Sequence, residues 1–567
     1  MPDRESPRTA AADLVAALAG VGVSHLFINP GTDTAPVQEA LADARARGTA
    51  HPRAVLCTHE FVALSSAMGH YFASGAPQAV MVHVDAGTLN LGGAVHNAQR
   101  NRVPVVVFAG RSPYSTDPAV PGHRDNTIQW QQEQPDQQAL LRAFGKWTLE
   151  VPRGRDLDPI VRRAYQVARS DPSGPAYVML PREALMEPGA ERPAAALRTP
   201  YPAAPDPAGL AEAARALADA RRPVIVTART GARPEAVPTL VALAELLGAP
   251  VIDHRHRANF PARHPLYAGA DTAALRDADA VLLLDVEVPW VPAGDAPPPD
   301  AAVVQIDVDC VKHTMPTWSY PVDVALNADT GTALPLLLAE LRGLATPART
   351  GRWGERRAEA AERLAALHRT WDELGGSADP GAAPDAMLHA LDKALPPEAI
   401  VLEEAITNKP AVARQIVRDP GTYFHTGSPA LGWAVAGALG VKLARPDAPV
   451  VAVSGDGAFG FSVPTAALWS AHRAGAPFVS VILNNRAYRA SRAPVERLFP
   501  DGTAQARGDF PETDLSPAPD YTHLARAYGA EAEAVDHPEH LPAAMNRALE
   551  VQASGRCALV DVRLPPP

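Results

Sequence analysis

The feature that most constrains this chain is an apolar run that ends in a carboxylate between two glycines. The run is Val-Val-Ala-Val, and Gly455-Asp456-Gly457 follows it after one serine. After a gap of 26 residues the chain reaches a pair of amides, Asn484 and Asn485. The gap has the pattern of a helix followed by a second apolar strand, so the whole stretch predicts a β-α-β unit.

The polar residues of this unit stand where its two strands end. In a parallel sheet, ligands bind outside the carboxyl ends of the strands. Asp456 and an asparagine would supply hard oxygen ligands there, and Mg²⁺ binds about six oxygens, several of them from phosphates and water. Gly455 and Gly457 let the backbone come close to phosphates. A Gly-Asp-Gly triplet alone is often a surface turn, but the amides at the next strand end favour a site for a metal and a diphosphate.

Length and composition set the class of protein. A chain of 567 residues is too long for one core and predicts about three domains. Its 47% apolar and 20% charged residues are typical of a soluble globular protein, and its net charge of −11 argues against a nucleic-acid partner. The three cysteines are scattered, so neither a disulfide framework nor a cysteine metal site is expected. The polar N-terminus and the lack of a membrane-length apolar run predict a cytoplasmic protein without a membrane partner.

Strand and helix patterns alternate along the chain, which predicts an α/β protein with three doubly wound parallel-sheet domains at 1–188, 205–345 and 385–567. The predicted strands lie at 25–28, 54–57, 79–84, 103–109, 224–226, 251–252, 280–284, 303–306, 400–402, 450–453, 478–483 and 558–562. The predicted helices lie at 10–19, 60–73, 87–101, 238–247, 427–443 and 463–474.

The Pro- and Ala-rich segment 186–207 is a predicted linker before the middle domain. A second predicted linker, 343–384, follows this domain and is charged and helical and then rich in Gly, Ala and Pro. Between Thr227 and Arg233 this domain has a single glycine, not the spaced glycines of a dinucleotide-binding loop. A structural role is therefore favoured over nucleotide binding.

The first and third domains share one order of elements. Residues 60–87 read as a helix, a turn with proline, an apolar strand and then an acidic residue beside glycine, and residues 431–457 repeat that order. This repetition predicts two domains built on one plan. Two such domains can face each other across a cleft that binds a ligand.

Gly-Asp-Gly, about 26 residues and then Asn-Asn resembles the motif of thiamine-diphosphate-dependent enzymes, closest to the group with acetolactate synthase and benzoylformate decarboxylase. The resemblance covers nearly the whole chain. It implies thiamine diphosphate as cofactor, with Mg²⁺ held by Asp456, Asn485 and the backbone carbonyl of Ala487. It also implies a pyrimidine-binding first domain, a structural middle domain and a diphosphate-binding third domain, paired between subunits of a homo-oligomer, a dimer or tetramer. The middle domain binds FAD in some members, but nothing in this sequence argues for FAD.

Glu60 stands where a predicted strand ends and a predicted helix begins. By position alone it would be a first-turn carboxylate stabilised by the helix dipole. Thr58-His59-Glu60 and the apolar residues after it match the family's glutamate motif. The resemblance implies that Glu60 binds the pyrimidine ring and promotes the imine tautomer of its amine. That role suits a carboxyl group in a dry pocket, because burial raises the pKa of a carboxyl.

His83 and Thr32 are candidates on the substrate side. A histidine that ends a buried strand is usually a core residue, but benzoylformate decarboxylase-like members have a histidine at the matching point. That match implies proton transfer around the substrate. Thr32, after Asn-Pro-Gly, matches a serine that contacts substrate in those members; a helix N-cap is the alternative. Asp33 and Asp85 receive no role.

The other cofactor contacts that the resemblance implies lie mostly in the third domain. Leu431 aligns with the apolar wedge between the two rings of the cofactor, although a core leucine is the simpler reading. Arg489 and Arg492 follow the metal loop, where they suit a carboxylate or phosphate on the substrate or are surface charges. The implied cofactor contacts are Glu60, Thr407, Gly427, Pro429, Leu431, Gly455, Asp456, Gly457, Ala458, Asn485, Ala487 and Tyr488.

The resemblance implies decarboxylation of a 2-oxo acid, followed by release of an aldehyde or ligation to a second carbonyl compound. His83 favours benzoylformate decarboxylase-like release, and overall similarity favours acetolactate synthase-like ligation. The alternatives are a lyase like 2-hydroxyacyl-CoA lyase or oxalyl-CoA decarboxylase, a non-catalytic thiamine-diphosphate-binding paralogue, and a Rossmann-type oxidoreductase. Intact Glu60, Asp456 and Asn485 argue against the paralogue, and the missing glycine pattern argues against the oxidoreductase.

Overall fold

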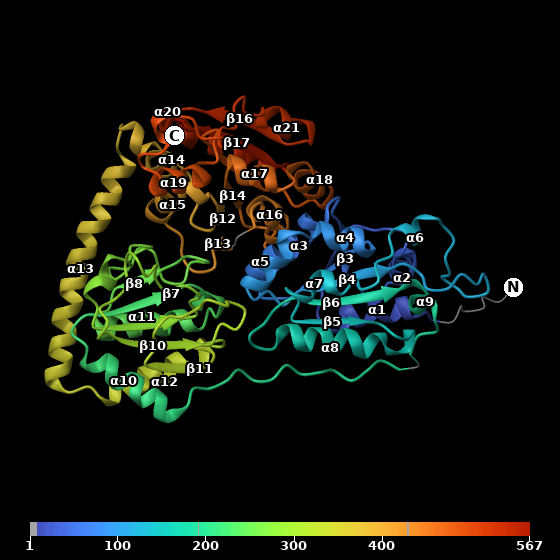
Figure 1. Ribbon diagram of the computed structural model, residues 1–567, viewed down its shortest axis with the longest axis horizontal. Helices are drawn as coiled ribbons and strands as arrows, with labels where there is room; N and C mark the ends of the chain where they lie inside the picture. The colour runs from blue at the N-terminus through green and yellow to red at the C-terminus, as the bar shows by residue number, and fades with distance from the viewer. Residues whose placement is uncertain (1–7, 191, 428–429, 567) are drawn as a thin grey trace.

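The computed structural model describes residues 8–190, 192–427 and 430–566. In this part of the chain, parallel strands form three sheets flanked by helices, which confirms the predicted α/β class (Figure 1). The central strands are buried, as expected where helices cover both faces of a parallel sheet. Among the described helices, none combines the length and the apolar character needed to cross a bilayer.

The first domain contains a six-stranded sheet. Its strands are β1 (His25–Ile28), β2 (Arg53–Leu56), β3 (Ala79–Val82), β4 (Val106–Arg111), β5 (Trp147–Glu150) and β6 (Ala176–Pro181). Its helices are α1 (Ala10–Gly20), α2 (Ala35–Arg47), α3 (Glu60–Ser74), α4 (Val84–Asn90), α5 (Gly93–Arg100), α6 (Ile128–Gln131), α7 (Ala139–Arg142), η1 (Gly154–Asp156), α8 (Leu157–Arg169) and α9 (Arg182–Met186).

The middle domain contains a five-stranded sheet in the order β11-β10-β9-β7-β8. Its strands are β7 (Pro223–Thr227), β8 (Val251–Asp253), β9 (Ala280–Leu284), β10 (Ala302–Asp307) and β11 (Val324–Asn327). Its helices are α10 (Pro207–Asp219), η2 (Thr230–Ala232), α11 (Ala236–Leu247), η3 (Ala273–Asp277) and α12 (Thr330–Gly343). The long helix α13 (Pro347–Gly375) then leads along the outside of the molecule to the third domain (Figure 1).

The third domain contains another six-stranded sheet. Its strands are β12 (Ile400–Glu404), β13 (Tyr423–His425), β14 (Val450–Gly455), β15 (Val479–Asn484), β16 (Glu531–Val535) and β17 (Ala558–Arg563). Its helices are η4 (Pro380–Ala382), α14 (Ala383–Ala394), η5 (Ile406–Asn408), α15 (Lys409–Gln415), α16 (Trp433–Ala444), α17 (Asp456–Phe461), α18 (Pro464–Ala474), α19 (Arg489–Leu498), α20 (Thr503–Arg507), α21 (Tyr521–Ala527), η6 (Pro538–His540) and α22 (Leu541–Ala553).

The first and third sheets have the same topology. The order is β2-β1-β3-β4-β6-β5 in the first and β13-β12-β14-β15-β17-β16 in the third, so each strand has a counterpart at the same place. The shared plan predicted from the repeated order of elements is therefore confirmed. It also makes β3, before His83, the counterpart of β14, before Asp456.

Two predicted helices were too long, because glycines with positive φ interrupt them. Instead of one helix at 87–101, α4 and α5 are separated at Gly92, where φ is 47°. The predicted helix at 427–443 begins only after Gly432, because Gly427 and Gly432 have φ values of 57° and 104°. A right-handed helix cannot continue through such a residue.

The pattern also missed some elements. Strands β5, β6, β11, β13 and β16 were not predicted, and all of them except β6 lie at sheet edges. A short or partly exposed edge strand leaves only a weak hydrophobic pattern. In the segment 343–384, predicted to be a helical linker, the 29-residue helix α13 confirms the helical part.

Helices α3 and α16 join the first and third domains through a contact that only small residues allow. A Cβ atom at Gly69 would overlap the carbonyl of Gly437, and one at Gly440 would overlap the carbonyl of Ser66. The Ser66 hydroxyl also donates a hydrogen bond of 2.9 Å to the carbonyl of Ala436. The two backbones therefore approach more closely than side chains would normally permit.

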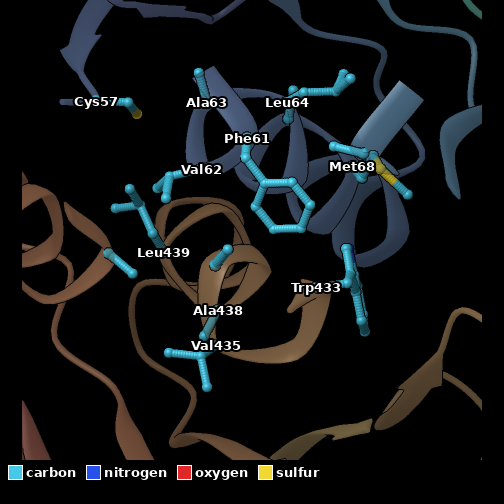
Figure 2. Close-up of a cluster of buried hydrophobic side chains, with 14 of the residues drawn as sticks. Cys57, Phe61, Val62, Ala63, Leu64, Met68, Trp433, Val435, Ala438 and Leu439 are labelled. Atoms are coloured by element: carbon cyan, nitrogen blue, oxygen red, sulfur yellow. The ribbon is translucent and has the colours of Figure 1, made fainter. Parts of the chain in front are cut away.

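The contacts follow the two helices in opposite directions, so the helices are antiparallel. Trp433 at the start of α16 packs edge-on against Phe72 near the end of α3, with ring centroids 5.5 Å apart. Apolar side chains from both helices surround this contact and form one core shared by the two domains (Figure 2). Glu60 consequently lies at one end of the helix pair and Leu431 at the other.

We predict that Gly440→Ala lowers the free energy of unfolding by about 1–3 kcal/mol, because the added methyl group pushes α16 away from the Ser66 carbonyl. Urea unfolding followed by tryptophan fluorescence measures the change. Gly354→Ala in α13 is the matched control, since a Cβ atom there meets nothing within 4 Å and should be neutral or slightly stabilising. Equal changes in the free energy of unfolding for the two variants would contradict the close contact between α3 and α16.

Candidate active site

Glu60 is the first residue of α3 and is buried near the carboxyl end of the first sheet. Its Oε1 accepts a hydrogen bond of 2.8 Å from the Nδ2 of Asn29, which follows β1. Gly87 of α4 lies against the same oxygen, where a Cβ atom would stand 3.1 Å away. The predicted first-turn position is therefore correct. The carboxyl group is also buried, and it contacts Asn29 at the end of a neighbouring strand.

His83 follows β3 at the same edge and is held from two sides. Its Nδ1 forms a short hydrogen bond with Oδ1 of Asp33, and its Nε2 lies 3.2 Å from Oε1 of Gln132. The hydrogen bond to Asp33 raises the pKa of His83, while burial opposes that shift. The side chain is 25% exposed, so His83 is not a fully buried core residue.

The Asp33–His83 pair depends on two glycines. A Cβ atom at Gly31 would overlap the ring of His83, and one at Gly110 would overlap the carboxyl group of Asp33. Thr32 beside the pair is exposed. The N-cap residue of α2 is Thr34, so the alternative reading of Thr32 as a helix cap is wrong.

Asp456 begins α17 at the carboxyl end of the third sheet and is buried. Its Oδ2 accepts a hydrogen bond of 2.7 Å from the backbone N–H of Arg486, in the turn after β15. Burial raises the pKa of Asp456. Gly457 packs against Tyr488, where a Cβ atom would stand 2.7 Å from the ring. The structure thus brings the glycine-flanked carboxylate and the turn after the paired amides together.

The two amides have different surroundings. Asn484 is buried and its Nδ2 donates a hydrogen bond of 2.9 Å to Asp561 on the neighbouring strand. Asn485 is only half-buried, and its Oδ1 accepts from the backbone N–H of Ala487 at 3.0 Å. Asn485 is therefore the amide that remains available for a ligand at this edge.

These donors fit Mg²⁺. Asp456, Asn485 and the carbonyl of Ala487 offer a carboxylate, an amide oxygen and a backbone oxygen, which are hard ligands. Within residues 8–190, 192–427 and 430–566, no cluster of three His, Cys, Asp or Glu side chains could hold a metal. A cation at this edge would therefore need further oxygens from phosphate and water.

The remaining predicted contacts lie around the same edge of the third domain. Thr407 is exposed in η5, directly after β12. Gly427 follows β13, and Leu431 is half-buried just before α16. Pro429 lies outside the described residues.

Glu404 holds the turn before α16, a role that spacing did not predict. Its Oε2 accepts hydrogen bonds from the backbone N–H groups of Gly432 and Ala434 at 3.0 and 3.1 Å. Burial raises the pKa of Glu404 to about 8. The side chain links the end of β12 to the residues that position Leu431.

Arg489 and Arg492 both form ion pairs with Glu496. Arg489 Nη1 lies 2.5 Å from one oxygen of Glu496, and Arg492 Nε lies 2.8 Å from the other. Arg492 also stacks on Phe510, with its guanidinium 4.1 Å from the ring centroid. Both arginines are thus engaged within the region of α19.

Within one chain, the residues around Glu60 and the residues around Asp456 belong to different domains. Glu60 bonds to Asn29 in the first domain, and Asp456 bonds to Arg486 in the third. The antiparallel helix pair places Glu60 and Leu431 at opposite ends of α3, whose 15 residues span roughly 20 Å at the rise of an α-helix.

Comparison with known proteins agrees with this geometry. Profiles of thiamine pyrophosphate enzymes match the chain with their N-terminal TPP binding domain at residues 8–140, their central domain at 210–337 and their C-terminal TPP binding domain at 406–562. Benzoylformate decarboxylase of Pseudomonas aeruginosa is 30% identical over 558 residues, which cover 95% of this chain and 96% of that protein. Acetolactate synthase of Mycobacterium bovis is 25% identical, with 95% and 86% covered.

A solved structure shows the same fold. The thiamine diphosphate-dependent 4-hydroxybenzoylformate decarboxylase of Rhodococcus jostii superposes with a TM-score of 0.78 at 24% identity, over 99% of both chains. This chain belongs to the family of thiamine pyrophosphate (thiamine diphosphate)-dependent enzymes, among its decarboxylases and carboligases. Its first and third domains are the thiamine pyrophosphate-binding domains of that family.

We predict that Asp33→Asn lowers the pKa of His83, because the hydrogen bond to Asp33 is the main cause that raises it above 6.5. The pair should stabilise the fold at a pH below 6.5, and this contribution should disappear as the pH rises through the folded-state pKa. NMR titration of labelled histidine, assigned with His83→Gln, measures the shift. Asp43→Asn, at an exposed position of α2, is the control, and an unchanged His83 pKa in Asp33→Asn would refute the pairing.

Proposed function

We propose that this protein is a thiamine diphosphate-dependent 2-oxo acid decarboxylase that releases an aldehyde. The observation that carries the proposal is the Asp33–His83 pair, which sets a partly exposed, proton-holding imidazole at the sheet edge where Glu60 also lies. Similarity to benzoylformate decarboxylase over 95% of the chain supports the same reading.

The proposed cofactor site combines both sheet edges. Asp456, Asn485 and the Ala487 carbonyl would hold Mg²⁺ and through it the diphosphate, since they supply hard oxygens at one place. Backbone groups close to the glycines and small residues after β14 would contact the phosphates. The full proposed set of cofactor contacts is Glu60, Thr407, Gly427, Pro429, Leu431, Gly455, Asp456, Gly457, Ala458, Asn485, Ala487 and Tyr488.

Bound thiamine diphosphate supplies a carbon nucleophile for the 2-oxo group and an acceptor for the electrons that remain when CO₂ leaves. Glu60 holds and returns a proton at the pyrimidine ring, with Asn29 fixing its orientation. Leu431, which precedes the turn that Glu404 holds, would pack against the rings of the cofactor. Thr32, exposed beside Asp33, contacts the substrate.

His83 would act on the substrate itself. Because Asp33 keeps its ring protonated to higher pH, His83 can donate a hydrogen bond to the substrate oxygen and then a proton to the product. Proton delivery favours release of an aldehyde. Ligation to a second carbonyl compound is the second candidate, because similarity to acetolactate synthase also covers 95% of the chain.

We infer a homo-oligomer, a dimer or tetramer, with active sites between subunits. Glu60 and Leu431 of one chain lie at opposite ends of the helix pair, so a cofactor on one third domain needs Glu60 of another chain. Leu89 of α4 and Phe461 of α17 support this arrangement, because they are 59% and 54% exposed on the helices after the equivalent strands β3 and β14.

The proposed domains are 1–188, 205–345 and 385–567, with a structural middle domain. Ion pairs between Arg102 and Asp307 and between Arg229 and Glu287 occupy the strand-end side of the middle sheet. The single glycine between Thr227 and Arg233 supports a domain without FAD, because a dinucleotide-binding loop has several spaced glycines. The three unpaired, buried cysteines support a cytoplasmic location.

We predict that Glu60→Gln lowers kcat for CO₂ release by about 10²- to 10⁴-fold, because glutamine cannot hold and return the proton. Affinity for thiamine diphosphate, titrated by tryptophan quenching with and without Mg²⁺, should change little and should require Mg²⁺ in both proteins. Glu39→Gln, a carboxyl group on exposed α2, is the matched control. Undiminished turnover in Glu60→Gln would discard the proposed role of this carboxyl group.

A further inference from the structure

A cavity of about 420 Å³ lies between the middle and third domains, and side chains of all three domains line it. Its charged and ionisable lining consists of Arg100, Arg229, His254, His256, Glu287 and Lys409. The proposed reaction has so far used none of these residues. Their charges and hydrogen bonds indicate what the cavity would bind.

Lys409 begins α15 and is half-buried. Among the described residues, none forms a hydrogen bond or ion pair with its ammonium group. Burial lowers the pKa of Lys409, and the charge of Glu403 counteracts this shift. Glu403 already accepts from the Tyr423 hydroxyl at 3.0 Å and pairs with His425 at 3.1 Å. Lys409 therefore lines the cavity without an ion pair to Glu403 or Asp253, although the charges of both act on it.

His254 and His256 follow β8 and also line the cavity. Neither imidazole forms a hydrogen bond within the described part of the chain, and Nδ1 of His256 is buried without a partner. Burial lowers the pKa of His254 to about 4 and that of His256 well below its ordinary value. Both rings are thus neutral near pH 7, and each offers one N–H donor to a ligand.

Positive charge exceeds negative charge in the lining. The single carboxylate among the lining residues, Glu287, is paired with Arg229. Arg100 donates to the hydroxyl and the carbonyl of Thr314, which carry no charge. Among the described residues, neither Arg100 nor Lys409 forms an ion pair with a carboxylate, although the charges of Glu403 and Asp253 act on Lys409. Charge removed from water without a partner is costly, so such a cavity favours an anionic ligand.

The cavity adjoins the proposed cofactor site. Thr426 and Gly427 form part of its wall, and a Cβ atom at Gly427 would overlap the ring of His256. Lys409 comes two residues after Thr407 in the chain. Since Gly427 and Thr407 are proposed cofactor contacts, a substrate that reacts at the cofactor can extend its far end into this space.

We propose that this cavity binds the end of the 2-oxo acid that does not react, and that this end carries a carboxylate, sulfonate or phosphonate. Lys409 and Arg100 supply the charge, and His254 and His256 supply neutral donors. The inference rests on the proposed function, because it assigns a substrate class to the same site. It also replaces Arg489 and Arg492 as the expected anion contacts, since Glu496 holds both of them.

The test compares probes that differ in the charge of the far end. Holoenzyme is assayed for CO₂ release with 2-oxopentanoate, 2-oxoglutarate, 3-sulfopyruvate and 3-phosphonopyruvate. The anionic probes should exceed 2-oxopentanoate in kcat/KM by roughly ten- to hundredfold, the usual effect of a hydrogen bond to a charged group. The order among the three anionic probes identifies the group that the cavity takes.

Lys409→Met removes the charge while keeping most of the chain length. It should abolish the preference by raising KM for the preferred anionic probe about tenfold or more, with little change for 2-oxopentanoate. Lys409→Arg should retain the preference, and Lys393→Met, the same change at an exposed position of α14, should alter nothing. A preference for 2-oxopentanoate, or an unchanged preference in Lys409→Met, would overturn the inference.

Calorimetric binding of the same four probes separates this inference from the proposed function. If no probe loses CO₂, the proposed decarboxylase function fails. Selective binding of an anionic probe that Lys409→Met abolishes would then still support the cavity's role. Equal binding of charged and uncharged probes would reject that role whether or not turnover occurs.

Discussion

The close contact between α3 and α16 decides where the proposed catalytic groups lie. Glycines let the two backbones meet at Gly69–Gly437 and at Ser66–Gly440, and the core around them belongs to both domains. Because the helices are antiparallel, Glu60 lies at the far end from the turn that opens α16. In the proposed function, the packing that joins the two domains of one chain therefore keeps its Glu60 away from the cofactor on its own third domain.

The two sister domains use one topology for different chemistry. Their strand orders match, so β3 and β14 deliver their following residues to equivalent edges. At the first edge, Asp33 and His83 share a short hydrogen bond, and Glu60 begins the helix after the neighbouring strand β2. At the other, Asp456 and Asn485 present hard oxygens suited to a cation. In the proposed function, one topology therefore supports proton transfer in the first domain and diphosphate binding in the third.

The sequence allowed the local parts of the site to be predicted, because each depends on a strand end and a nearby motif. Asp456 and the turn after Asn485 do meet, as spacing predicted. Asn29 and Gln132 were missed because their contacts with Glu60 and His83 depend on which strands and loops become neighbours. The cavity beside Gly427 could not be predicted from the sequence either, because residues of all three domains line it. The helix breaks were missed because a glycine's φ value depends on its surroundings.

If Glu60 of one subunit and Asp456 of another act on the same thiamine diphosphate, defects in the two residues should complement each other. Chains carrying Glu60→Gln and Asp456→Ala can be co-expressed with different tags and purified through both. Each variant alone should be nearly inactive, whereas the mixed assembly should recover roughly half of the wild-type CO₂ release, because one of every two sites is intact. A mixed assembly as inactive as its parents would contradict sites shared between subunits.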